Sequence, residues 1–280
     1  MNPDNEVLRE DSLEGNSDEN STTFDQISHV ILRGLKERTS VKYLQIRTQE
    51  TKPSLLDTKI GGIPYFPIGA EYPKHTRNDT PLYLLCQLNF DTLPKLEDFP
   101  QTGILQIFID GDVFMGMDFD DPTAQDSWRI VYYPTIDTDP THQQKLPDLP
   151  KPERFPFEGE YKLSVKPSIG CIRSGDYRFT KVVNGLFEGE LSANGWSDWE
   201  IHDHQMMDTQ YGGSRIGGYP TFVQEDPRKY NNFEKTVLLF ELESDRHVMW
   251  GDMGVANFLI SKEALRNCDF LDVYYVWDCS

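Results

Sequence analysis

The feature that most constrains the fold of this chain is a phrase that occurs twice. Residues 59–66 read KIGGIPYF and residues 215–222 read RIGGYPTF, so five positions are identical and the first is basic in both copies. An apolar run follows each copy, at 82–91 and 236–245, and a further one lies at 103–109 and 254–260. The three elements recur in the same order, at spacings of 156, 154 and 151 residues. We therefore predict two copies of one structural unit, with slightly shorter loops in the second.

The composition favours sheets and disfavours anionic partners. Sixteen Phe and 13 Tyr suit strands better than helical bundles. The formal charge of −19 repels phosphates and anionic lipid, so we expect neither nucleic acid nor a membrane surface as a partner. A basic protein or a cation is the expected partner.

The charge is partly concentrated in the first 23 residues, which hold seven acids and one base. Such a polar, acidic stretch cannot repay its ordering entropy, so we predict a disordered tail at 1–23. Residues 24–280 are then predicted to form a single domain with internal pseudo-repeats at about 41–135 and 196–279.

The chain has no apolar run of membrane-spanning length, no signal-peptide pattern and four widely spaced cysteines, which predicts a cytoplasmic protein with reduced thiols.

Short apolar runs punctuated by Pro, Gly and Asp predict a β-dominated α+β protein. Helical spacing predicts an N-terminal helix from Phe24, a second at Tyr177–Phe187, and a short one capped by Ser261. Asp110-Gly111 predicts a tight hairpin between strands at 104–109 and 113–117. The proline-rich segment from Asp137 to Pro156 is predicted to be an extended connection between the repeats.

Several ordered phrases resemble the YwqG-like family of bacterial proteins. They are IGGxP, PLYLLCQLNF at 81–90, GILQIFI at 103–109, GGYPTFVQEDPR at 217–228 and MWGDMGVANF at 249–258, and the resemblance covers roughly residues 43–279. It implies antiparallel sheets in a roll-like arrangement with an N-terminal helix, and a biochemical function that is itself unassigned. Some relatives lie beside secreted-toxin systems, which suggests an immunity or adaptor role by association.

Two clusters contain residue types that commonly bind metal ions. Asp118, Asp120 and Asp121 gather carboxylates that could hold Ca²⁺, although an ordinary turn capped by Asp also explains them. His202 and His204 have the spacing of two imidazoles on one face of a strand, as a zinc site requires, but no third ligand is evident and solvated histidines on an acidic segment explain them better. No cofactor is expected.

The second repeat has the richest set of candidate binding residues. Acid, base, amide and aromatic side chains are predicted at corresponding ends of neighbouring strands, where a sheet could present them to a ligand; they are Gln224, Asp226, Arg228, Trp250, Asp252 and Asn257. The alternative is structural: a buried Trp250 and an ion pair between Asp252 and Arg228. The two Gly-Gly pairs could expose N–H groups to an anion, but a tight bend before Pro accounts for them better.

These observations predict a non-enzymatic binding protein, plausibly of the immunity type, that neutralises a basic toxin or another cationic partner. A metal-assisted hydrolase that uses the Asp or His cluster is the alternative. A third hypothesis places the contact surface in the acidic tail. The sequence does not determine the oligomeric state.

Overall fold

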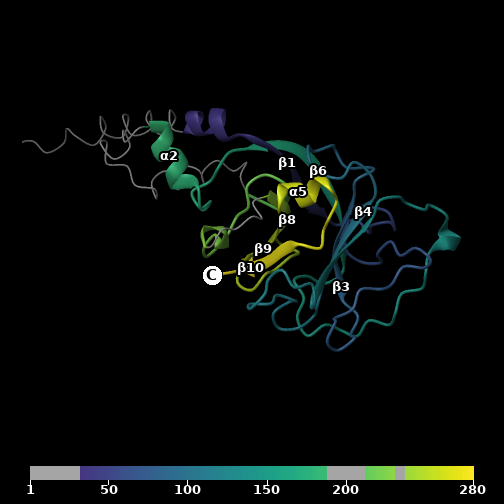
Figure 1. Ribbon diagram of the computed structural model, residues 1–280. Helices are drawn as coiled ribbons and strands as arrows, with labels where there is room; N and C mark the ends of the chain where they lie inside the picture. The colour runs from purple at the N-terminus through teal and green to yellow at the C-terminus, as the bar shows by residue number, and fades with distance from the viewer. Residues whose placement is uncertain (1–31, 188–211, 231–236) are drawn as a thin grey trace, which may run out of the picture.

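Ten antiparallel strands form a single curled sheet in this protein (Figure 1). The computed structural model describes residues 32–187, 212–230 and 237–280. Within these ranges the strands are β1 (Val41–Gln49), β2 (Lys59–Gly61), β3 (Tyr83–Asn89), β4 (Ile104–Ile109), β5 (Trp128–Tyr133), β6 (Glu160–Gly170), β7 (Arg215–Ile216), β8 (Val237–Glu243), β9 (Val255–Ile260) and β10 (Val273–Asp278). The predicted β-dominated, roll-like class is confirmed.

The helical elements within the described ranges are few and short. Residues 32–39 are helical, α2 spans Phe179–Phe187, and α5 spans Lys262–Arg266 with the predicted Ser261 cap, whose hydroxyl accepts the Ala264 N–H. Two 3-10 turns are η1 (Pro140–His142) and η2 (Pro227–Lys229). None of the described helices is long and apolar enough to cross a membrane. The predicted acidic tail and the start of the predicted first helix lie outside the described residues.

The strand order shows how the two repeats are combined. It runs β10-β9-β8-β7-β1-β6-β2-β3-β4-β5, so β1 and β6 pair at the centre, from Val41 opposite Gly170 to Gln49 opposite Lys162. On either side lie equivalent strands, β2 to β5 and β7 to β10. Thus β1 lies beside β7, and β6 lies beside β2. Each half therefore borders the first strand of the other, and we propose that the two halves fold as one domain.

An irregularity in the ladders repeats with the sequence. The pairing of β3 with β4 shifts register between Leu84 and Cys86, and that of β8 with β9 shifts between Leu238 and Phe240. A bulge inserts one extra residue and bends a strand. Because the two bulges are separated by the spacing of their runs, 154 residues, the duplication extends to backbone geometry.

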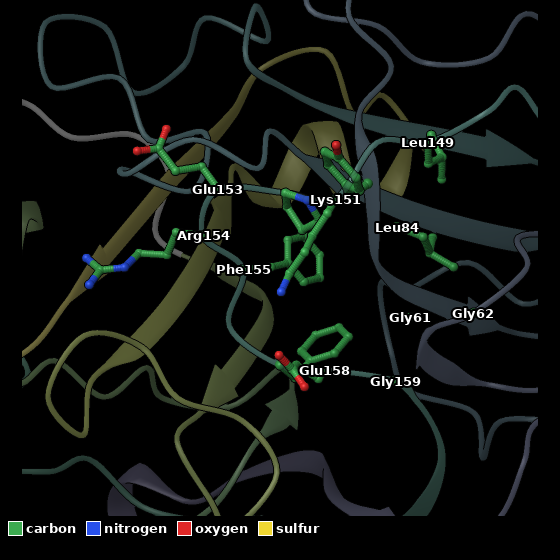
Figure 2. Close-up of a pocket in the computed structure, with 13 residues that line it drawn as sticks. Gly61, Gly62, Leu84, Leu149, Lys151, Glu153, Arg154, Phe155, Glu158 and Gly159 are labelled. Atoms are coloured by element: carbon green, nitrogen blue, oxygen red, sulfur yellow. The ribbon is translucent and has the colours of Figure 1, made fainter.

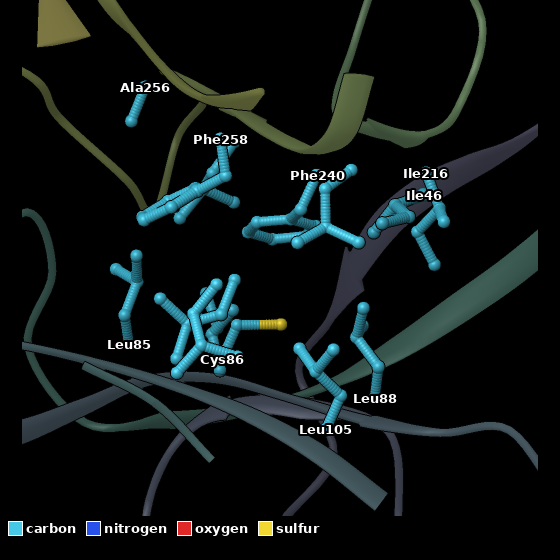
Figure 3. Close-up of a cluster of buried hydrophobic side chains, with 14 of the residues drawn as sticks. Ile46, Leu85, Cys86, Leu88, Leu105, Ile216, Phe240, Ala256 and Phe258 are labelled. Carbon is cyan, nitrogen blue, oxygen red and sulfur yellow. The ribbon is translucent and has the colours of Figure 1, made fainter. Parts of the chain in front are cut away.

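The sheet curls so that its two wings, strands β2 to β5 and strands β7 to β10, enclose one hydrophobic core (Figure 3). Leu85, Cys86 and Leu88 of one wing lie opposite Phe240 and Phe258 of the other. The edge strands also approach each other. The rings of Trp128 in β5 and Tyr275 in β10 are 5.6 Å apart, and the Tyr275 N–H donates to the Pro122 carbonyl at 3.0 Å.

The hairpin predicted at Asp110-Gly111 is wrong. Residues 113–116 form turns, and the partner of β4 is β5, which begins at Trp128. Asp110 instead bonds locally, through its carboxylate to the Gly111 N–H and through its own N–H to Ser127. The Asp-Gly pair is thus a bend at the start of an 18-residue connection, residues 110–127, and not a two-residue turn.

Phe258 should be a principal contributor to stability. Its buried ring stacks on Tyr275 with centroids 4.5 Å apart and lies 5.9 Å from Trp128. We expect Phe258→Ala to lower the free energy of unfolding by about 3–5 kcal/mol in chemical denaturation, because it leaves a cavity between the wings. The control Leu271→Ala, at a side chain that is 80% exposed, should change it by less than about 0.5 kcal/mol. Equal losses of stability in Phe258→Ala and Leu271→Ala would contradict the placement of Phe258 in the core.

Candidate functional site

Each half has a row of three buried polar side chains across neighbouring strands. The first row is Lys59, Gln87 and Gln106, on β2, β3 and β4, and the second is Arg215, Glu241 and Asn257, on β7, β8 and β9. Members of a row stand opposite one another in the ladder. They lie on the face of the sheet away from the core, because side chains alternate along a strand. The repeated phrase supplies the first member each time.

The first row binds the backbone of the loop that follows the Gly-Gly turn. Gln87 Oε1 accepts the Tyr65 N–H at 2.8 Å, and Gln106 Nε2 donates to the Tyr65 carbonyl at 2.8 Å. Lys59 Nζ donates to the carbonyls of Ser54, Leu55 and Ile63. The basic residue of the phrase is therefore a structural donor to backbone oxygens, which buried peptide groups require.

The second row repeats these contacts with charged groups. Glu241 accepts the Thr221 N–H at 2.5 Å, and Asn257 Nδ2 donates to the Thr221 carbonyl at 2.7 Å. Arg215 donates to the Tyr219 carbonyl and pairs with Glu241, with Nε and Oε1 2.8 Å apart. Asn257, predicted as a binding residue, is thus completely buried and holds the loop that carries Gln224, Asp226 and Arg228.

The Gly-Gly turns take backbone conformations that favour glycine. Gly61 has a φ of +63°, and a Cβ there would lie 2.5 Å from the Gly159 carbonyl oxygen. Gly217 has a φ of +70°, and a Cβ there would lie 2.8 Å from Leu96. Their predicted role as tight bends accounts for the glycines without any ligand.

Glu241 differs from its counterpart Gln87 by being ionisable. Burial raises the pKa of Glu241 to about 7, with a further increase from Glu243 and an opposing decrease from Arg215. A carboxyl whose pKa is higher in the folded chain contributes stability at low pH and loses it as the pH rises toward the folded pKa, because the native state then holds a proton that the unfolded state has released.

We therefore expect Glu241→Gln to gain stability relative to the wild type as the pH rises from about 5 to about 8, by roughly 1–3 kcal/mol. Urea unfolding of both proteins at the two pH values measures the difference. Glu97→Gln, at an exposed acid, is the control and should show no such trend. An equal difference in unfolding free energy between Glu241→Gln and the wild type at both pH values would contradict the raised pKa of Glu241.

Asp226 and Arg228 belong to a buried ion network. Arg228 Nη2 lies 2.7 Å from Asp226 Oδ2 and 2.9 Å from Asp176 Oδ2, and all three side chains are at most 2% exposed. Arg178 binds both oxygens of the same Asp176 carboxylate, with Nη2 2.7 Å from Oδ2 and Nε 2.8 Å from Oδ1. Although burial raises the pKa of Asp176, Arg178 and Arg228 bring it below its ordinary value. The pair suggested between Asp252 and Arg228 is thus wrong, since Arg228 faces Asp226 and Asp176, while the Asp252 side chain is exposed.

Removal of Arg228 should therefore destabilise the protein strongly. We expect Arg228→Ala to lower the free energy of unfolding by about 3–5 kcal/mol, because it leaves Asp226 without its buried partner. Arg228→Lys should restore only part of this, since an ammonium cannot bind both carboxylates in the same fork geometry. Arg246→Ala, at a 69% exposed ion pair with Glu50, should cost less than about 1 kcal/mol. Comparable losses in Arg228→Ala and Arg246→Ala would contradict the network.

The remaining predicted binding residues lie near the end of β10. Gln224 donates its backbone N–H to Asp278 at 2.8 Å and its side-chain amide to the Cys279 carbonyl at 2.9 Å. Trp250 is fully buried, with its ring 6.0 Å from that of Trp277. The candidate set is therefore divided among a loop anchor, a core residue, an exposed acid, the buried network and the second polar row, which includes Asn257.

The predicted metal ligands are accounted for separately. Asp118 Oδ1 accepts the N–H groups of Asp120 and Asp121 at 2.9 and 3.1 Å, as in the turn considered above. His202 and His204 lie outside the described residues. Among the residues that the structure describes, no group of three or more potential ligands is placed to hold a metal ion.

The connection between β4 and β5 forms an exposed surface that sequence patterns did not single out as a whole. Residues 110–127 contain six Asp and no Lys, Arg or His. Val113, Phe114 and Phe119 on the same connection are 44%, 47% and 67% exposed, and the two Phe rings meet edge to face, 5.2 Å apart. We name residues 112–121 the acidic aromatic surface.

The acidic aromatic surface is firmly attached to β10. The Trp277 indole Nε1 donates to the Phe114 carbonyl at 2.7 Å, and the Tyr275 hydroxyl donates to Met115 at 2.9 Å. Trp277 also contacts the turn that carries exposed Met249 and Met253 beside Asp252. The loop is thus presented on a rigid support, as recognition surfaces commonly are.

Comparison with known families assigns the chain to one group. Residues 58–279 match the model of a domain of unknown function, DUF1963, and the chain belongs to this family. The match begins one residue before the first copy of the repeated phrase, so it includes β2 to β10 and leaves out β1. A comparison with curated proteins finds no match.

Proposed function

We propose that this protein is a non-enzymatic binding protein that recognises a basic partner through the acidic aromatic surface. The observation that carries the proposal is the combination on residues 112–121 of four carboxylates, no basic side chain and three exposed apolar side chains. Among the described residues, Arg77 Nη2 lies 3.7 Å from Asp118 and 3.5 Å from the neighbouring Asp126, and His75 Nε2 lies 4.0 Å from Asp110.

The two kinds of side chain contribute differently to binding. A concentrated negative field attracts a basic surface and accelerates encounter, mostly without adding affinity. Exposed aromatic rings provide the apolar contact area that dominates binding energy in protein interfaces. Phe114 and Phe119 would therefore anchor the partner, while Asp118, Asp120 and Asp121 would select for positive charge.

The charged groups of the second repeat support binding over catalysis. Arg228, Asp226 and Asp176 neutralise one another in the interior, and Glu241 is engaged with Arg215. A catalytic group needs access to its substrate, which these buried pairs lack. The metal-assisted hydrolase remains an alternative hypothesis that no contact in the described residues favours.

We further infer that the chain is a YwqG-like member of its family, on the phrases given above. That resemblance associates some relatives with secreted toxins, and a basic toxin is one partner that fits the acidic aromatic surface. A cytoplasmic location is part of the same proposal.

The proposal predicts a charge-selective and ring-dependent interaction. The probe is a fluorescent amphipathic peptide of lysine and leucine, whose binding is measured by anisotropy at low salt. We expect a variant with Phe114→Ser and Phe119→Ser, and another with Asn at 118, 120 and 121, each to bind about tenfold more weakly than the wild type.

The matched control removes three charges elsewhere, by Glu71→Gln, Glu97→Gln and Asp148→Asn, all at exposed side chains. It should change the dissociation constant less than about threefold, since distant charges are screened. If the control weakens binding as much as the triple Asn variant, the attraction belongs to the net charge and the proposed surface is wrong.

A further inference from the structure

A cleft opens beside the first Gly-Gly turn (Figure 2). It lies between Gly61-Gly62, the side chains of Tyr83 and Leu84 on β3, and the extended segment 149–159. Its volume is about 660 Å³. Sites for small molecules typically enclose about 300–1,000 Å³, so the cleft has the capacity for one.

Both Gly-Gly turns are closely packed on one side. An added Cβ would lie 2.9 Å from Phe157 at Gly61 and 2.3 Å from Glu160 at Gly62, and it would lie 2.8 Å from Leu96 at Gly217 and 2.9 Å from Tyr43 at Gly218. The cleft borders the first of these two turns.

The outer wall of the cleft is held in place despite having no regular secondary structure. The Tyr83 hydroxyl donates to the Pro150 carbonyl at 2.9 Å, and the Arg154 N–H donates to the Gly111 carbonyl at 2.9 Å. The Met249 N–H, from the other wing, donates to Pro156 at 2.6 Å. Three anchors along segment 149–159 make the cleft a preformed feature, which lowers the entropic cost of binding.

Aromatic rings provide the apolar part of the cleft. Phe155 lies 5.8 Å from the ring of Tyr83 and 4.9 Å from that of Phe157, measured between centroids. Leu84 and Leu149 complete this lining. Ring faces and edges at these spacings favour a flat apolar group, by stacking or edge-to-face contact.

Two opposite charges accompany the rings. Lys151 and Glu158 line the cleft, and neither forms an ion pair with any residue in the described part of the chain. Figure 2 shows Lys151 extending past Phe155, whereas the side chains of Glu153 and Arg154 point away from the rings. A ligand with a negative and a positive group would give each of the two unpaired side chains a partner.

We propose that this cleft binds a zwitterionic small molecule with a flat apolar body, the chemistry of a free aromatic amino acid. The ring would lie among Tyr83, Phe155 and Phe157, the carboxylate would face Lys151, and the ammonium would face Glu158. The inference is independent of the proposed recognition of a basic partner.

The test uses four probes in isothermal titration calorimetry with the full chain: phenylalanine, 3-phenylpropionate, phenethylamine and glycine. The second and third each lack one charge, and glycine lacks the ring. We expect phenylalanine to bind at least about tenfold more tightly than any of the other three, because only it engages all three parts of the cleft. No heat from phenylalanine at millimolar concentration would overturn the proposal, as would equal affinity for 3-phenylpropionate or phenethylamine.

Variants locate the binding on the chain. Lys151→Met and Glu158→Gln should each weaken phenylalanine binding about tenfold, while Arg154→Met and Glu153→Gln remove the same charges from the same segment and should leave it within about twofold. All four side chains are exposed, so each variant should fold. Equal loss in a variant and its control would place the binding elsewhere. The Phe114→Ser, Phe119→Ser protein should retain phenylalanine binding, which separates this proposal from the previous one.

Discussion

The antiparallel pairing of β1 with β6 is the constraint on which the rest of the structure depends. It joins nine residue pairs at the centre of the sheet and places each repeat's first strand beside the other repeat. Because the halves share this ladder, they cannot separate without breaking backbone hydrogen bonds in both. The curl of the sheet then brings Trp128 and Tyr275, at opposite edges, into one core. That closure attaches the acidic aromatic surface to β10.

The buried polar rows explain why the repeated phrase begins with a base. In each half, side chains on three strands bind the backbone of the loop beyond the Gly-Gly turn, at Tyr65 or Thr221. The first row does so with amides and a lysine that meets only carbonyls, whereas the second uses an ion pair between Arg215 and Glu241. The same architecture is therefore held in one half by amides and a lysine whose pKa burial lowers to about 8, and in the other by a buried ion pair whose carboxyl has its pKa raised by burial to about 7.

The two proposed sites both occur where the duplication is imperfect. The 18-residue connection between β4 and β5 has as its counterpart in the second half a segment with the short helix α5, and only the former gathers six carboxylates around exposed rings. The cleft beside Gly61-Gly62 has as its outer wall the segment 149–159, which belongs to the connection between the repeats. Repeated elements provide the scaffold, and its unmatched parts provide surfaces that a partner or ligand can reach.

The sequence by itself determined the duplication, the sheet-rich class and most strands, because alternation and turn residues are local signals; β4 and the Ser261 cap lie where they were predicted. Only the tertiary structure determined which strands and which side chains pair with each other. Asp110-Gly111 has the local chemistry of a hairpin, but pairing of β4 with β5 overrides it. Arg228 was predicted beside Asp252, yet its partners are Asp226 and the distant Asp176. Asn257 and Trp250 were candidate binding residues and both are buried, which for Trp250 is the structural alternative that the sequence also offered. Which side chain meets which depends on the register and curl of the whole sheet, and no local pattern encodes those.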